Sequence, residues 1–217
     1  MIIKTGIKIG SIFTLAIFLI NCATMSKDEC LHADWYIKGL DDASDGYALD
    51  RISDHAKACA RVDIKPNAQD YENGHKKGAR LYCVPNKGYS EGRKGVSYNG
   101  ICPASLENNF LRAYRDGQEL FSIQQKMDQL ANDISNSRSQ IDSNYNEIHA
   151  LKHDIIDRDS NSQERRYKLR RIDDLQDEAT ALDIRIDRDA REIELFQNDY
   201  RILEDKHYRM GYLIEKP

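Results

Sequence analysis

The sequence predicts an all-α protein, in which a small disulfide-stapled helical domain precedes a long antiparallel coiled-coil hairpin. Between about residues 120 and 210, apolar residues recur at every seventh position in two successive runs. A polar segment at residues 157–163 separates the runs, and cysteine, glycine and tyrosine are concentrated before them. We therefore expect a signal segment at 1–21, a Gly/Tyr/Cys-rich helical domain at 22–118, and a hairpin at 119–213 with arms 119–156 and 163–213.

The hairpin is predicted by two seams of regularly spaced residues. Apolar residues at alternating spacings of three and four form a stripe that a single helix cannot bury. The seams comprise Leu120, Ile123, Met127, Leu130, Ile134, Ser137, Ile141, Asn144, Ile148, Leu151 and Ile155, then Ile172, Leu175, Ala179, Leu182, Ile186, Asp189, Ile193, Phe196, Tyr200, Leu203 and Met210. The two seams are out of phase, which favours two helices over one.

A turn near Ser160 pairs the arms. Ser160 with Gln163, or Asn161 with Glu164, offers a capping box that starts a new helix. Folding back at this point places Ile134 near residue 186 and keeps most layers apolar. The polar seam members Ser137, Asn144, Lys168 and Asp189 are expected to fix the register at a cost in stability, and His207 also falls on the seam. A parallel oligomer of one longer helix is the alternative.

The composition fits a small core joined to a long solvated part. The chain has 217 residues, 31% of them charged and 8% aromatic, with a mean hydropathy of −0.71. Its net charge of −4 gives no reason to expect nucleic acid, since nucleic-acid-binding proteins usually show a basic face. We therefore expect no nucleic-acid partner.

The first residues predict export. Lys4 and Lys8 precede an apolar run at 9–20, which is shorter than the roughly 20 residues that span a bilayer and is typical of a secretory signal. The following Leu19-Ile20-Asn21-Cys22 resembles the lipobox of bacterial lipoproteins, although Asn21 stands where a smaller residue is usual. The resemblance implies a lipid on Cys22 and, with Ala23 next, sorting to the outer membrane. An ordinary cleaved signal or an uncleaved anchor is the alternative.

The cysteine count supports export from the cytoplasm. Of the five cysteines, lipidation of Cys22 leaves Cys30, Cys59, Cys83 and Cys102, an even set that indicates disulfides in an exported protein. We favour Cys30–Cys59 with Cys83–Cys102, because each pair closes a local loop. Zinc is the rival, but no pair has the close spacing of zinc ligands.

Aromatic residues followed three or four positions later by glycine recur in the first half of the chain. They are Trp35 with Gly39, Tyr71 with Gly74 and Gly78, Tyr89 with Gly92 and Gly95, and Tyr114 with Gly117. Glycine inside a helix lowers helix stability by up to about 1 kcal/mol relative to alanine, so its repeated use indicates a role in packing. We expect glycine faces that let helix backbones approach closely; helix ends or turns are the alternative.

Helix boundaries in this half follow from caps and turn residues. Ser26 with Glu29 forms a capping box, and we expect its helix to run through Trp35 to Leu40. A second helix is expected at 47–62, with Pro66 in the first turn of a third. Residues 84–89 are predicted to form a turn.

The ordered cysteines, glycines and tyrosines resemble a bacterial lipoprotein family catalogued as a domain of unknown function, number twenty-seven ninety-nine. The matching residues are Cys22, Met25, Ser26, Cys30, Asp34, Trp35, Gly39, Asp42, Gly46, Cys59, Asp70, Tyr71, Gly74, Gly78, Tyr82, Cys83, Gly92, Gly95, Tyr98, Cys102, Pro103, Phe110, Tyr114 and Gly117. The resemblance covers about residues 22–121 and implies an envelope lipoprotein, without implying a reaction. The coiled coil is an extension beyond it.

Strings that suggest chemistry lack the context that the chemistry needs. The segment 88–92 matches the G-x-S-x-G nucleophile elbow, but no parallel sheet is predicted to present its serine. A calcium loop starting at Asp41 fails at its twelfth position, which is Ile52. His149 and His153 lie four apart on the first arm and are expected to face water. We therefore expect no catalytic residues, no cofactor and no metal.

The function predicted from the sequence is that of a non-enzymatic lipoprotein of the outer membrane, facing the periplasm. A membrane would hold it through Cys22, and the coiled coil would serve as a spacer or docking arm for another envelope component. The alternative is a small-ligand-binding or enzymatic module in the Gly/Tyr-rich domain. Its pocket would be lined by Trp35, Asp42, Tyr71, Tyr82 and Tyr98.

Overall fold

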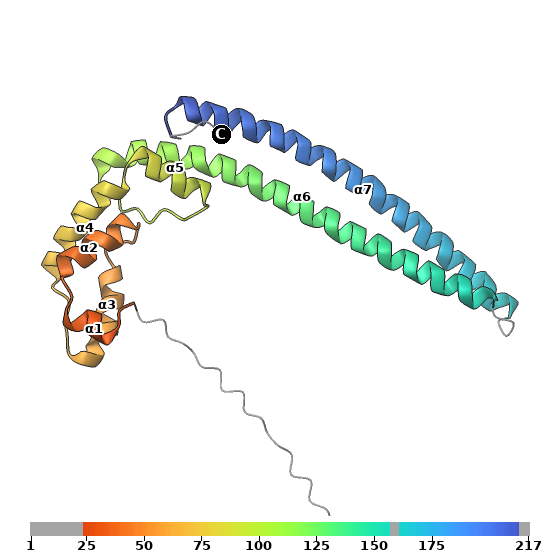
Figure 1. The fold of residues 1–217 in the computed structure, drawn as a ribbon, viewed down its shortest axis with the longest axis horizontal. Helices are drawn as coiled ribbons and strands as arrows, with labels where there is room; N and C mark the ends of the chain where they lie inside the picture. The colour runs from red at the N-terminus through yellow and green to blue at the C-terminus, as the bar shows by residue number, and fades with distance from the viewer. Residues whose placement is uncertain (1–23, 157–160, 213–217) are drawn as a thin grey trace, which may run out of the picture.

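The computed structural model describes residues 24–156 and 161–212, in which every regular element is helical (Figure 1). The helices are α1 (Lys27–Leu31), α2 (Trp35–Ser44), α3 (Arg51–Cys59), a 3₁₀ turn (Ala60–Val62), α4 (Ala68–Tyr82), α5 (Pro85–Arg93), α6 (Ala104–Ile156) and α7 (Ser162–Arg209). No described helix combines the length and the hydrophobicity that crossing a bilayer requires. The predicted signal segment and Cys22 lie outside the described residues.

Figure 1 shows two regions. Helices α1 to α5 and the first turns of α6 form a head domain, and the rest of α6 extends from it with α7 folded back alongside. The all-α architecture with a hairpin is therefore confirmed. The predicted boundary at residues 118 and 119 falls inside α6, which passes from the head domain into the arm without interruption.

The first helix is shorter than predicted. The capping box of Ser26 and Glu29 is present, but α1 ends at Leu31 and Asp34 caps a new helix by accepting a hydrogen bond from the backbone N–H of Ile37. The break has a tertiary cause. Helix α1 carries Cys30, which is bonded to α3, whereas α2 packs along α4. One straight helix could not face both neighbours.

Two further boundary predictions were wrong. Pro66 lies before the helix, because Asn67 is the N-cap and its side chain accepts from the N–H groups of Gln69 and Asp70. The predicted turn at 84–89 is instead the start of α5, with Pro85 in the first helical turn. Proline is tolerated there because the N–H that it lacks would have no partner within the helix.

Helices α2 and α4 meet through their glycines. A Cβ on Gly39 would overlap the carbonyl oxygen of Tyr71, and a Cβ on Gly74 would overlap that of Tyr36. Each glycine therefore receives the carbonyl of the tyrosine that precedes the glycine of the other helix by three residues. The predicted glycine face is confirmed, but its first aromatic member is Tyr36 rather than Trp35, which packs near Met25 and Cys30.

The same reciprocal contact joins α5 to α6. A Cβ on Gly92 would overlap the carbonyl oxygen of Tyr114, and a Cβ on Gly117 would overlap that of Tyr89. The head domain thus contains two helix pairs built on one Tyr-x-x-Gly contact. Removing the side chain at each crossing lets the backbones approach to the distance of Cα–H···O contacts.

The disulfides fasten the two ends of this domain. Cys30 is bonded to Cys59 and Cys83 to Cys102, the pairing that loop length favours. The first lies in a small core with Met25 and Ala58. The second joins the end of α4 to the residues just before α6, beside the packed rings of Tyr82, Tyr98, Phe110 and Tyr114.

The arm is an antiparallel pair whose register agrees with the predicted seam. Asn161 and Glu164 form the capping box that starts α7. Near this end Ile148 packs with Ile172 and Leu175, and farther along the predicted polar seam members Ser137, Asn144 and Asp189 are buried. Ion pairs cross the seam, as between Arg171 and Glu147 at 2.8 Å and between Lys168 and Asp154 at 3.6 Å. Folding back within one chain, rather than a parallel oligomer, forms this coiled coil.

The open end of the hairpin is fixed to the head domain. Tyr200, Leu203 and Tyr212 pack against a cluster of Tyr89, Ala113 and Leu120. Arg93 of α5 also forms an ion pair with Glu204 of α7 at 3.3 Å. The base of the arm is thus joined to the head by both α6 and the returning α7.

Candidate functional site

A buried polar network occupies the centre of the head domain. Asp42 of α2 accepts a hydrogen bond on Oδ2 from the Tyr71 hydroxyl at 2.6 Å, and the same oxygen lies 2.6 Å from Nε2 of His55 on α3. All three residues are buried, with at most 5% of their surface exposed. One carboxylate oxygen therefore links α2, α3 and α4.

The position of Asp42 explains why it needs these partners. It lies in the last turn of α2, where the helix dipole disfavours a negative charge. A carboxylate that is also removed from water is stable only with donors directed at it. His55 and Tyr71 supply these donors. The glycine contacts join only α2 to α4, and the bond between Asp42 and His55 adds α3 to them.

The pKa values follow from this geometry. Burial by itself would raise the pKa of the Asp42 carboxyl, but the hydrogen bonds from His55 and Tyr71 outweigh it and lower that pKa below its ordinary value. Burial and the neighbouring carboxylate raise the pKa of the Tyr71 hydroxyl well above its ordinary value. At neutral pH the network therefore holds a charged carboxylate and a neutral phenol.

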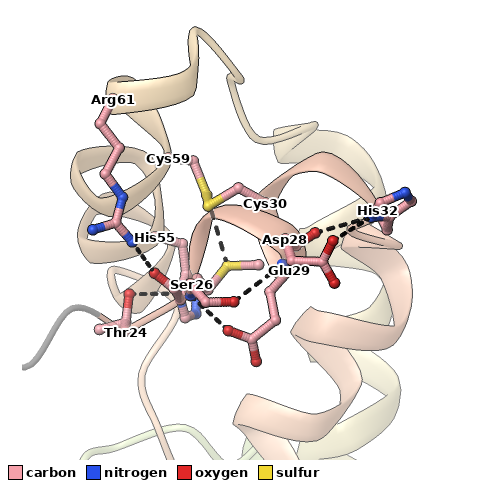
Figure 2. Close-up of a disulfide and its surroundings, with 10 residues drawn as sticks. Thr24, Ser26, Asp28, Glu29, Cys30, His32, His55, Cys59 and Arg61 are labelled. Atoms are coloured by element: carbon pink, nitrogen blue, oxygen red, sulfur yellow. Dashed lines mark hydrogen bonds and ion pairs between the residues drawn. A yellow bond between two sulfur atoms is a disulfide. The ribbon is translucent and has the colours of Figure 1, made fainter.

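The network continues to the start of the described chain. Nδ1 of His55 lies 2.9 Å from the hydroxyl of Thr24, and Arg61 donates a hydrogen bond to the carbonyl of Met25 at 2.6 Å (Figure 2). Met25 is buried beside the Cys30–Cys59 disulfide, with its sulfur 3.9 Å from that of Cys59. The chain is thus fixed to the head domain two residues after Cys22.

Hydroxyl, imidazole and carboxylate in a row are also the components of a nucleophilic triad. A triad needs donors placed to stabilise an oxyanion beside the hydroxyl, as well as room for a substrate. Here Thr24 is half-buried and is followed at once by Met25, which packs into the core. The arrangement holds the N-terminal segment in place.

The five residues predicted to line a ligand pocket belong to three separate contact sets. Asp42 and Tyr71 belong to the buried network, and Trp35 packs against the first disulfide core. Tyr82 and Tyr98 pack on Phe110 near the second disulfide. The sequence pointed to Asp42 and Tyr71 only as two of five pocket residues. It did not single out His55 or Thr24, whose only signal was their polar character within a predicted helical domain.

The arm presents apolar side chains to solvent. Ile184, Leu195 and Ile202 are 66%, 68% and 59% exposed on α7, and their spacings return them to about the same face of a helix with 3.6 residues per turn. At the tip, Ile156 is 81% exposed and Tyr167 is 64% exposed. His149 and His153 are exposed, as predicted. The string Gly88–Gly92 lies within helix α5 and has no preceding strand.

The fold defines the class as a disulfide-stapled helical domain that carries a coiled-coil hairpin. Residues 34–119 match the family model described as "Protein of unknown function (DUF2799)", so this segment is similar to the domain of that family. The match includes Asp42, His55 and Tyr71 but ends soon after α6 begins, leaving most of the arm beyond it. No curated protein and no solved structure gives a significant match.

Proposed function

We propose that the protein is a lipoprotein of the bacterial outer membrane, tethered through Cys22, whose hairpin is a non-enzymatic docking arm for another envelope component in the periplasm. The observation that carries the proposal is the fixed arm. Helix α6 runs without a break from the head domain to the tip at Ile156, and α7 returns to pack on α5. At 1.5 Å per residue, the part of α6 beyond the head extends about 55 Å.

The head domain supports the tethering half of the proposal. Thr24 and Met25 are held by His55 and Arg61, so a lipid on Cys22 would lie against the domain rather than at the end of a loose linker. A short, fixed connection sets the distance between the membrane and the base of the arm. Disulfides on either side of the domain suit an oxidising compartment outside the cytoplasm.

The arm surface supports the docking half. The two helices of the hairpin bury the apolar seam between them, so the seam needs no second chain to cover it. Exposed aliphatic side chains nevertheless remain on α7, at Ile184, Leu195 and Ile202. Amphipathic helices commonly dock through such residues at helical spacing. The dispersal of Trp35, Asp42 and Tyr98 among separate clusters gives the ligand-pocket alternative less support.

Mass spectrometry of the mature protein tests the tether. The expected mass is that of a chain beginning at Cys22 with diacylglycerol and acyl groups attached. A Cys22→Ala variant should lose both the lipid and the membrane fractionation. A wild-type chain without lipid would contradict the proposed anchor.

Site-specific photo-crosslinking in living cells tests the arm. A photoreactive residue at position 184, 195 or 202 should give the same discrete crosslinked envelope component. Matched substitutions at Leu31 and Leu81, which are exposed on the head domain at 58% and 55%, should give less of it. Equal crosslinking from head and arm, or none from the arm, would refute a docking arm.

A further inference from the structure

At the base of the hairpin, two carboxylates and one imidazole meet. Asp116 and Glu119 lie one turn apart on α6, and His207 comes from the last turn of α7. One oxygen of each carboxylate and one ring nitrogen of His207 all lie within 4.8 Å of one another. In the described ranges this is the only group of three potential metal-ligating side chains at such distances.

His207 indicates what this group is for. Its side chain is 0% exposed, yet neither ring nitrogen has a hydrogen-bond partner. Oδ2 of Asp116 is also buried without a partner. A buried polar group normally forms a hydrogen bond or coordinates a metal, because losing water without replacement is unfavourable. Two residues with unsatisfied buried atoms, in a group whose ligand atoms lie within 4.8 Å of one another, fit an ion placed between them.

The surrounding residues hold two of the three ligands in place. The His207 ring packs edge-on against Tyr89 at 5.3 Å between ring centroids, and Tyr212, which is stacked on Tyr89 at 5.1 Å, lies 6.2 Å from the His207 ring. Burial and the neighbouring Asp116 carboxyl raise the pKa of the Tyr212 hydroxyl, so Tyr212 lies close to Asp116 as well as to His207. The nearby cation Arg93 is already paired with Glu204 at 3.3 Å.

We propose that Asp116, Glu119 and His207 bind one zinc ion, which fastens the end of α7 to α6. Zinc accepts a mixed set of imidazole nitrogen and carboxylate oxygen, with water as the fourth ligand, whereas calcium and magnesium prefer all-oxygen sets. Zinc–ligand bonds of about 2.0–2.2 Å draw the ligand atoms well inside the 4.8 Å that bounds their present separation. The exposed Glu119 side chain is free to make that movement, and it also leaves a path for the ion.

A zinc ion here would close the hairpin at its open end. The capping box of α7 lies at the tip. At the base, α7 contacts α5 through packing around Tyr89, through the Arg93–Glu204 ion pair and through a hydrogen bond from Arg93 to the Tyr200 hydroxyl. Coordination would add a bond between α6 and α7 beside those contacts. The inference does not depend on lipidation at Cys22 or on a docking partner.

Isothermal titration of zinc chloride into the untagged, chelator-treated full chain in detergent tests the site. We expect one zinc per chain, with an affinity reduced about 100-fold or more in Glu119→Gln and in His207→Gln, because even the loss of an outer partner weakens metal binding 10–100-fold. The matched control replaces the other histidine pair, His149→Gln with His153→Gln, and should bind as the wild type does. Glu119 is exposed, so its variant should keep the metal-free circular dichroism spectrum.

A second readout locates the ion. The imidazole NMR signals of His207 should shift on zinc addition, and those of His149 and His153 should not. The inference is overturned if the wild type binds no zinc, if Glu119→Gln and His207→Gln bind as tightly as the wild type, or if the control variant alone loses binding.

Discussion

The head domain and the arm are held together by different means. In the head, backbones touch through glycines such as Gly39 and Gly74, and disulfides and one buried carboxylate join the helices. In the arm, side chains fill the seam and several buried layers are polar, including Asn144 and Asp189. The stability of the head therefore depends on a few specific contacts, whereas the stability of the arm depends on a packing pattern that repeats along the seam.

This difference predicts how each region responds to change. A substitution in the seam of the arm disturbs the packing of one layer only, because the neighbouring layers keep their own contacts. A side chain added at a glycine crossing disrupts all the contacts of that crossing, because the two helices must move apart. The two responses can be measured separately: Trp35 is the only tryptophan and lies in the head, whereas most of the helical signal comes from α6 and α7.

The largest effect is expected at a glycine crossing. Gly74→Ala places a Cβ where the Tyr36 carbonyl oxygen lies, and we expect it to reduce the free energy of unfolding of the head by about 4 kcal/mol. Alanine otherwise favours a helix by about 1 kcal/mol, so a loss must come from packing. Urea unfolding followed by Trp35 fluorescence measures it. Lys77→Ala, exposed on the same helix, is the control, and an equal small effect in both would contradict the contact.

A smaller loss is expected when the buried carboxylate loses a donor. Tyr71→Phe removes the hydrogen bond to Asp42 and should cost about 2 kcal/mol, the range for bonds to buried charges. Tyr36→Phe is the matched control, since that ring is 39% exposed. If the two variants unfolded at the same urea concentration, the bond would contribute nothing.

Acidification should remove the contribution of the same carboxylate. The pKa of Asp42 is lowered in the folded state, so its stabilisation is present above the unfolded value of 3.8 and is lost as the pH falls through the folded value. We expect Asp42→Asn to be less stable than the wild type at pH 7, with the difference narrowing below about pH 4. A difference that stays constant from pH 7 to pH 2 would exclude this linkage.

In the arm, replacing a buried polar residue should increase stability. Asn144 is 2% exposed, and its amide nitrogen has no hydrogen-bond partner. Asn144→Leu should raise the free energy of unfolding by about 1–2 kcal/mol in circular dichroism, because an unsatisfied polar group is removed from the seam. Asn132→Leu, at an exposed position, is the control. Sedimentation should also reveal association if Asn144 enforces pairing within one chain.

The smallest effect is expected at an exposed ion pair of the arm. Arg171 donates two hydrogen bonds to Glu147, but both side chains are accessible to water and to salt. Arg171→Ala should leave the melting temperature of the arm unchanged within error, because water screens such pairs. A change as large as that of Asn144→Leu would show that this crossing contributes more than an exposed pair should.

Local and periodic features were predictable from the sequence. The seam, the cap at Asn161 and both disulfides follow from spacing, because each involves a repeat or a short loop. The glycine faces were also predicted, but not their partners. The sequence predicts a turn where the helix α5 starts at Pro85, because proline and glycine together occur both in turns and in the first turn of helices.

The candidate sites were less predictable. Asp42 and Tyr71 were singled out, but for a pocket that also needed residues from two other clusters. His55 carried no spacing signal that linked it to either of them. His207 was recognised as a seam residue, yet its meeting with Asp116 depends on how far α7 returns along α6.

The sequence by itself determined that the chain is helical and where its arm turns, and it favoured the observed cysteine pairing, because these features depend on residues near one another or on a fixed period. Only the tertiary structure decided which backbone carbonyl packs against each helical glycine, which donors reach Asp42 and which side chains surround His207. Those contacts join residues from different helices. Their geometry is set by the crossing of whole helices, which the order of residues along any one helix does not specify.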